Sequence, residues 1–114
     1  MLLYSIIIFA IAAVGGVVLA SKVLTGKFAP WALSIVHALL GATGLVLLAS
    51  EVVLGAGVAR LTAALALLVV AALGGFYLAS LHLRKQIAPQ GIVFIHAGVA
   101  VVGFLTLLTV LLGI

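Results

Sequence analysis

The sequence predicts an all-α integral membrane protein, a four-helix up-down bundle built from two parallel tandem-repeated helical hairpins. Three observations predict it: a very apolar composition, four apolar stretches of membrane-spanning length, and an internal repeat. Of the 114 residues, 68% are hydrophobic and 5% are charged, whereas soluble domains carry about a quarter charged residues. Five Lys and Arg and one acid cannot build a charged surface facing water. This composition excludes a soluble enzyme, a disordered tail and a nucleic-acid binder.

Each apolar stretch is long enough to cross a bilayer as a helix, which takes about 20 residues. The first covers roughly residues 2–21 and lacks the basic start of a signal peptide, so it is interpreted as a retained helix. The other three cover roughly residues 31–50, 61–81 and 91–113. Little chain remains between them, so residues 1–114 are expected to form a single membrane domain. Short connections favour an up-down arrangement of neighbouring helices.

The basic residues set the expected orientation. Lys22 and Lys27 lie between the first two stretches, and Arg84 and Lys85 lie between the last two. In the middle connection the one cation is offset by the only acid. The positive-inside rule therefore predicts that the first and third connections are cytoplasmic and that both termini lie outside. A bacterial inner membrane is the expected location.

The chain is a tandem repeat. A shift of 59 residues aligns residues 1–55 with residues 60–114 without a gap. Matches among Leu and Ala are common in so apolar a chain, but the shift also pairs the only two prolines and two of the three histidines. Each repeat is a two-helix hairpin that crosses the membrane twice, so the second repeat begins on the same side as the first. Residues matched by the shift therefore lie at the same depth.

Two histidines define a layer inside the predicted bundle. His37 and His96 each follow a proline by seven residues. Since proline favours the first turn of a helix, both imidazoles lie about 10 Å inside the cytoplasmic edge. The second and fourth helices are diagonal neighbours in such a bundle, and two inward imidazoles with one metal ion between them span about that diagonal. Glycines reach the same depth on the first and third helices, and small residues follow each histidine on its own face. These positions are Gly15, Gly16, Gly74, Gly75, Gly41, Gly44, Ala100 and Gly103.

A planar macrocycle held axially by two helices and edge-on by two others needs this arrangement, and haem b with two histidine ligands requires no cysteine. The layer resembles the haem-binding bundle of the membrane cytochromes b, in which diagonal helices supply histidines and intervening helices supply glycines. The resemblance implies that His37 and His96 are the metal ligands and that the glycines contact the haem. Haem propionates would emerge at the cytoplasmic side, where Arg84 or Lys85 is the preferred partner.

The resemblance stops at the second haem of that family. Those proteins usually carry another histidine about four turns further along each ligand helix. Here the corresponding positions are Ser50 with Glu51 and Thr109 with Val110. The resemblance therefore implies one haem, near the cytoplasmic side.

The leading hypothesis is a single-haem b-type cytochrome that relays electrons between a quinol or a reductase and a partner, without a catalytic site of its own. One haem near one face cannot carry an electron across the whole bilayer, which predicts a partner subunit, a homodimer or a sensing role. One alternative is a structural subunit of a larger membrane complex, with histidines that bridge helices. Another is a small transporter or channel, although residues 1–21 lack the acid that small multidrug exporters carry in their first helix.

The roles of two polar residues near the histidine layer stay open. Ser34 precedes His37 by three residues and is a candidate hydrogen-bond partner for its second nitrogen, whereas the matching position in the second repeat is a valine. His82 has Val23 as its repeat mate and is expected at the cytoplasmic edge. It could bond a haem propionate, receive a proton, or have no role.

Overall fold

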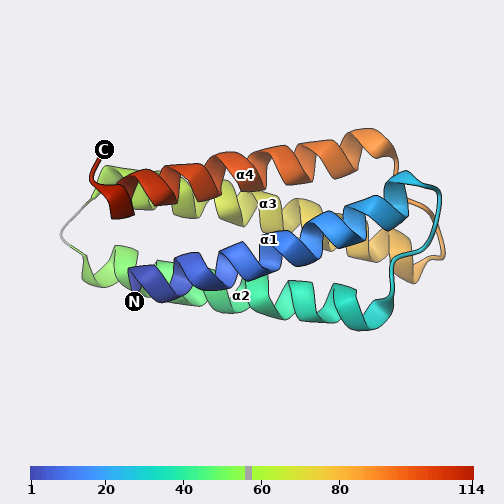
Figure 1. The fold of residues 1–114 in the computed structure, drawn as a ribbon, viewed down its shortest axis with the longest axis horizontal. Helices are drawn as coiled ribbons and strands as arrows, with labels where there is room; N and C mark the ends of the chain where they lie inside the picture. The colour runs from blue at the N-terminus through green and yellow to red at the C-terminus, as the bar shows by residue number, and fades with distance from the viewer. Residues whose placement is uncertain (56–57) are drawn as a thin grey trace.

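The computed structural model, which describes residues 1–55 and 58–114, confirms the predicted all-α four-helix bundle (Figure 1). Its helices are α1 (Leu2–Leu24), α2 (Trp31–Leu54), α3 (Ala59–Leu83) and α4 (Gln90–Leu112). Each of them is long and apolar enough to cross a membrane. They begin and end within a few residues of the predicted stretches, because polar residues such as Ser21 and Lys22 continue the last helical turn beyond the apolar run.

The helices pack as two antiparallel hairpins lying side by side. The most extensive contacts are α1 with α2 and α3 with α4, and the hairpins meet through α2 with α3 and through α1 with α4. In the part of the chain that the structure describes, no Cα atoms of α1 and α3 lie within 8 Å of each other, and the same holds for α2 and α4. The two helices that carry the paired histidines are therefore diagonal, as the sequence predicts.

Pro30 and Pro89 stand immediately before α2 and α4. Both have extended backbone, with ψ angles of 131° and 137°. Because proline has no backbone N–H, it suits the start of a helix, where that group would have no intrahelical acceptor. The carbonyl groups of both prolines accept hydrogen bonds from the first turn, from the N–H groups of Ser34 and Val93 at 3.0 and 3.3 Å. The prolines thus fix where each second helix of a hairpin begins.

The turns that end α1 and α3 have the same geometry. In each, a backbone N–H donates to a carbonyl five residues earlier, at 3.0 Å in the first turn and 2.9 Å in the second. The residue just before the donor is left-handed in both: Gly26 with φ of 77° and Lys85 with φ of 56°. A residue with left-handed backbone just before the donor is common at the end of a helix, and glycine is the usual residue there. The 59-residue shift pairs these two positions.

Replacement of Lys85 by glycine is expected to stabilise the protein by about 1 kcal/mol, because a side chain with Cβ is strained at positive φ. The reciprocal change, Gly26→Lys, should destabilise it by a similar amount. Thermal unfolding in detergent, followed by the helical circular dichroism signal, measures both. A fall in melting temperature for Lys85→Gly would contradict the expectation.

The buried core occupies the half of the bundle that holds both termini. It is built from the beginnings of α1 and α3 and the ends of α2 and α4, through Ile6, Phe9, Leu48, Leu61, Ala64, Leu68 and Leu107. Glycine allows close packing here. A Cβ added at Gly44 would lie 2.7 Å from the Phe9 ring, and one at Gly103 would lie 2.9 Å from the Leu68 side chain.

Gly44→Ala should therefore destabilise the protein by about 1–3 kcal/mol, the usual cost of overpacking. Gly41 is a matched control one turn earlier in α2, because a Cβ added there has no atom within 4 Å. Gly41→Ala should stabilise the protein by about 1 kcal/mol through helix propensity alone. Chemical unfolding of the two variants side by side tests the pair, and equal effects would show that Gly44 is not a packing residue.

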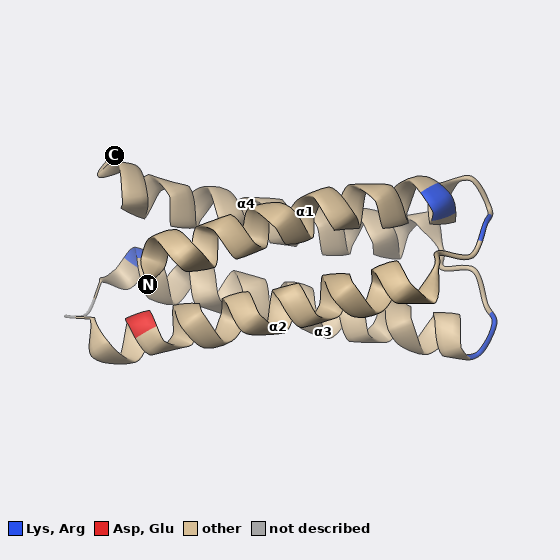
Figure 2. Cartoon of the chain, turned by 60° about the horizontal axis from the view of Figure 1, so that its bottom comes forward, with Lys and Arg blue, Asp and Glu red and all other residues tan. Residues whose placement is uncertain are grey.

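The charged residues lie at the two ends of the bundle (Figure 2). The first and third connections hold four of the five cations at one end, as the sequence predicts. At the other end, the Glu51 carboxylate lies 3.9 Å from the amino group of Met1, and Arg60 donates to the Thr109 hydroxyl at 3.2 Å. The long faces between the ends expose mainly large apolar side chains. This distribution is compatible with an integral membrane protein whose long axis, 44 Å, crosses the bilayer.

Candidate functional site: a histidine pair in an apolar cavity

His37 of α2 and His96 of α4 meet in the interior of the bundle. The centres of their imidazole rings are 6.4 Å apart, and the ring planes are inclined at 80°. Both side chains are half-buried. The paired histidines, which are 59 residues apart in the sequence, therefore form one site between the two hairpins.

Each imidazole is held by a backbone carbonyl of its own hairpin. Nδ1 of His37 lies 2.8 Å from the carbonyl oxygen of Ala12, and Nδ1 of His96 lies 2.7 Å from that of Ala71. A carbonyl can only accept, so each Nδ1 carries the proton and donates it. In the neutral ring, Nε2 then keeps a lone pair. The Ser34 hydroxyl, expected from the sequence to hold His37, does not do so, because the Ala12 carbonyl takes that position.

The glycine pairs of α1 and α3 lie against the histidine rings. A Cβ added at Gly16 would lie 3.1 Å from Cε1 of His37, and one added at Gly75 would lie 3.1 Å from Cε1 of His96. Gly15 and Gly74 face the same two rings. A Cβ added at Gly15 would lie 3.9 Å from Nδ1 of His37, and one added at Gly74 would lie 3.6 Å from Nδ1 of His96. Here glycine makes room for the imidazole itself, so that the ring can reach the carbonyl one turn earlier on the neighbouring helix.

Both histidines line a cavity of about 420 Å³ in the half of the bundle nearest the first and third connections. Small side chains form much of its wall, among them Ala38, Gly41, Ala42, Ala79, Ala97 and Ala100. The volume lies within the range of small-molecule and cofactor sites, about 300–1,000 Å³. The closely packed core and this cavity thus divide the bundle into a filled half and a hollow half.

The cavity extends to the connections, where its lining becomes polar. Lys27, His82 and Gln86 line this mouth. The two cations that the sequence analysis prefers for a carboxylate lie elsewhere. Arg84 folds back on its own helix, with Nε 3.3 Å from the Ser80 carbonyl oxygen, and Lys85 borders a separate hollow at the end of the bundle. Lys27 is therefore the cation placed to meet an anionic ligand group.

The sequence-derived site residues fall into four groups. His37, His96, Gly16, Gly75 and Gly41 line the cavity, and Gly15 and Gly74 support the histidine rings. Gly44 and Gly103 pack in the core, and Arg84 and Lys85 lie outside the cavity. Sequence reasoning did not find the two carbonyl acceptors, because a backbone group has no signature in the residue type.

The donor set limits which metal centre the residues fit. Within residues 1–55 and 58–114 no three His, Cys, Asp or Glu side chains gather as a metal site. A zinc ion takes three or four protein ligands, whereas haem brings four nitrogen ligands of its own and needs two axial ones at most. Two imidazoles bound to one ion at about 2 Å each would have ring centres roughly 6 Å apart. The observed separation fits that spacing.

Comparisons of the chain with models of protein families, with curated proteins and with solved structures found no match.

Proposed function

We propose that the protein is a single-haem b-type membrane cytochrome, with His37 and His96 as the two axial ligands, that relays electrons to or from a partner. The observation that carries the proposal is the pair of imidazoles 6.4 Å apart in an apolar cavity, each with Nδ1 engaged by a carbonyl. Metal-bound histidines characteristically donate their other ring N–H to such an acceptor, which fixes the ring and leaves Nε2 for the metal.

The size of the cavity also supports a resident ligand. The hollow of about 420 Å³ is lined mainly by apolar side chains and has the size of a small-molecule or cofactor site. A flat apolar ligand would contact that lining, and the small side chains leave room for one.

Each part of the site has a task in this proposal. Haem, when bound, supplies a one-electron redox couple. The carbonyls of Ala12 and Ala71 hold the two imidazoles in position, and Gly16 and Gly75 let the rings lie close to the neighbouring helices. Lys27 is available to pair with a propionate at the mouth. The apolar wall keeps water from the metal.

The position of the histidines near one end of the bundle sets the side on which a redox partner would bind. A single centre there serves a partner on that side, which we propose to be a quinol or a redox protein, in a homodimer or a larger membrane complex. By the positive-inside rule, the end with Lys22, Lys27, Arg84 and Lys85 is cytoplasmic, and both termini lie outside. A bacterial inner membrane is the proposed location.

A structural role is the second candidate, and the same hydrogen bonds favour it. His37 links α2 to α1, and His96 links α4 to α3. Histidines that only bridge helices would stabilise a subunit of a larger complex without binding a cofactor. Such a protein would be colourless, and His→Gln would be tolerated better than His→Leu, because glutamine retains a donor for the carbonyl.

The test is an absorption spectrum of the detergent-purified protein, first oxidised and then reduced with dithionite, before and after addition of haemin. The proposal expects sharp reduced Soret and α bands of the b type at one haem per chain. A colourless protein that also fails to take up haemin would overturn it and leave the structural role.

A further inference from the structure

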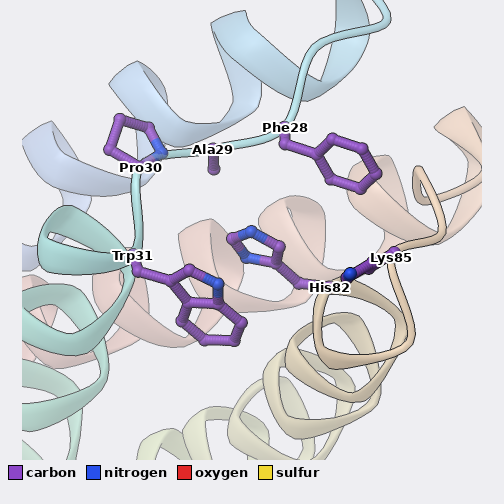
Figure 3. Close-up of a pocket in the computed structure, with 6 residues that line it drawn as sticks. All are labelled: Phe28, Ala29, Pro30, Trp31, His82 and Lys85. Atoms are coloured by element: carbon purple, nitrogen blue, oxygen red, sulfur yellow. The ribbon is translucent and has the colours of Figure 1, made fainter.

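Three aromatic rings form a stack at the mouth of the cavity (Figure 3). The His82 imidazole of α3 lies parallel to the Trp31 indole at the start of α2, with ring centres 3.9 Å apart and planes within 6°. The Phe28 ring, from the connection between α1 and α2, is 5.8 Å from His82 at 13°. The stack therefore joins the first hairpin to the second at the end of the bundle that holds the first and third connections.

The stack separates two hollows. Phe28 and His82 line the interior cavity and also a second hollow of about 450 Å³ at the end of the bundle. Trp31 and Lys85 border only the outer hollow. Phe28 and Trp31 are each nearly half exposed, at 49% and 42%. The rings thus form a thin wall between the histidine cavity and the surroundings of the connections.

The second repeat has no such stack. The 59-residue shift pairs His82 with Val23, Phe28 with Ile87 and Trp31 with Gln90. Val23 and Ile87 also line the cavity, so the mouth has two related sides that differ in chemistry. One side carries the stacked rings, and the other carries the aliphatic side chains of Val23 and Ile87.

We propose that the Phe28–His82–Trp31 stack is a gate on one side of the mouth, and that the cavity ligand passes through it when the stack separates. Separation requires only side-chain rotations in residues at the ends of helices and in a connection, so the packed half of the bundle does not have to open. The aliphatic side has no comparable interaction to make and break. The inference rests on the proposed function only in assuming that the cavity takes a ligand.

Access to the cavity can be measured without any cofactor. The chain has no cysteine, so Ala71→Cys places a single thiol at a buried position of the cavity wall, and a charged, water-soluble maleimide reports how fast it becomes reachable. In that background, His82→Val and Trp31→Gln install the residues that the other repeat carries at the matched positions. Each should raise the labelling rate about three- to tenfold, as loss of an aromatic stacking contact predicts. Val23→Ala on the opposite side is the matched control and should leave the rate unchanged.

Haemin then tests passage of the proposed ligand in the chain without the added cysteine. His82→Val should speed both uptake of haemin and its transfer to excess apomyoglobin, with the final haem content unchanged. The fluorescence of Trp31, the only tryptophan in the chain, reports whether the stack is intact in each apo variant.

The outcomes separate the two proposals. Equal labelling rates in all variants, or an equal rise with Val23→Ala, would overturn the gate. Faster labelling in a protein that takes up no haemin would support the gate and overturn the cytochrome. Unchanged haemin kinetics in His82→Val, with haem bound, would overturn the gate as the route of the ligand.

Discussion

Alanine in place of either His37 or His96 is expected to abolish stoichiometric haem binding. Each substitution would remove one of the two proposed axial ligands and leave the iron with a single bond to the protein, so the haem would be held too weakly to stay bound through purification. The reduced α band should be lost, and the haem content measured after denaturation in alkaline pyridine should fall from one per chain to near zero. The apo protein should lose only about 0.5–1.5 kcal/mol of stability, the usual value of one hydrogen bond.

The third histidine supplies the control. His82 lies at the mouth and is not part of the pair, so His82→Val should retain the spectrum and the haem content of the parent protein. Two further variants, His37→Gln and His96→Gln, distinguish a haem ligand from a residue that only bridges helices. Glutamine can donate a hydrogen bond to the carbonyl of Ala12 or Ala71 but cannot replace an imidazole as an axial ligand. Full haem content in both alanine variants would refute the assignment of the ligands.

Gly41→Leu is expected to raise the stability of the apo protein and to weaken the binding of haemin. Gly41 lines the cavity one turn after His37, and no atom lies within 4 Å of a Cβ built there. A leucine would fill part of the hollow and gain helix propensity, which together should stabilise the apo protein by about 1–3 kcal/mol. The same side chain would occupy space that the ligand needs, so haemin uptake should fall at least tenfold, an energy change of about 1.4 kcal/mol.

Gly98→Leu is the matched control for that substitution. Gly98 lies on α4, has no atom within 4 Å of an added Cβ, and does not line the cavity. It should show the gain from helix propensity without the loss of haemin uptake. Unfolding curves and haemin titrations on the same preparations measure both properties. If Gly41→Leu bound haemin as well as the parent protein, the cavity would not be the haem site.

The features that could be predicted from the sequence are those set by hydropathy and by the repeat. Apolar stretches of spanning length gave the four helices, and Pro30 and Pro89 gave the starts of two of them. The 59-residue shift placed His37 and His96 at one depth, and the order of the helices placed them on a diagonal, so the structure brings them together. These inferences need only the helical rise and the topology, not the position of any particular side-chain atom.

The features that escaped prediction depend on side-chain direction or on backbone atoms. The acceptors of the histidine Nδ1 groups are carbonyls, and Ala12 and Ala71 look like any other alanine in the sequence. Gly15, Gly16, Gly74 and Gly75 were expected to contact a flat ligand; Gly16 and Gly75 line the cavity, and all four also lie against the imidazoles, a contact that the sequence did not reveal. Lys27 rather than Arg84 lines the cavity, because Arg84 bonds back to Ser80 on its own helix. Cations at the same end of the bundle cannot be told apart by their position in the sequence alone.

The location of His82 shows the same limit. Its lack of a histidine partner in the other repeat was visible in the sequence, but its stacking with Trp31 and Phe28 depends on how the first connection folds across the end of α3. Comparison of the two repeats would have marked these three positions as a group, since all three differ from their mates in the same region of the bundle.

Every hydrogen bond that holds a paired histidine is internal to one hairpin, and this has a consequence for how such a protein can arise. Two identical copies of one hairpin, associated about a twofold axis, would already contain two imidazoles with their carbonyl acceptors and glycines. In that homodimer any residue at the mouth would appear twice, so both sides would be closed in the same way. Joining two copies in one polypeptide removes this constraint, because each copy can then accept substitutions that the other does not share. His82, which has no histidine mate in the other repeat, is such a substitution. A chain with two covalently linked hairpins is the simplest one in which the two sides of the cavity mouth can differ.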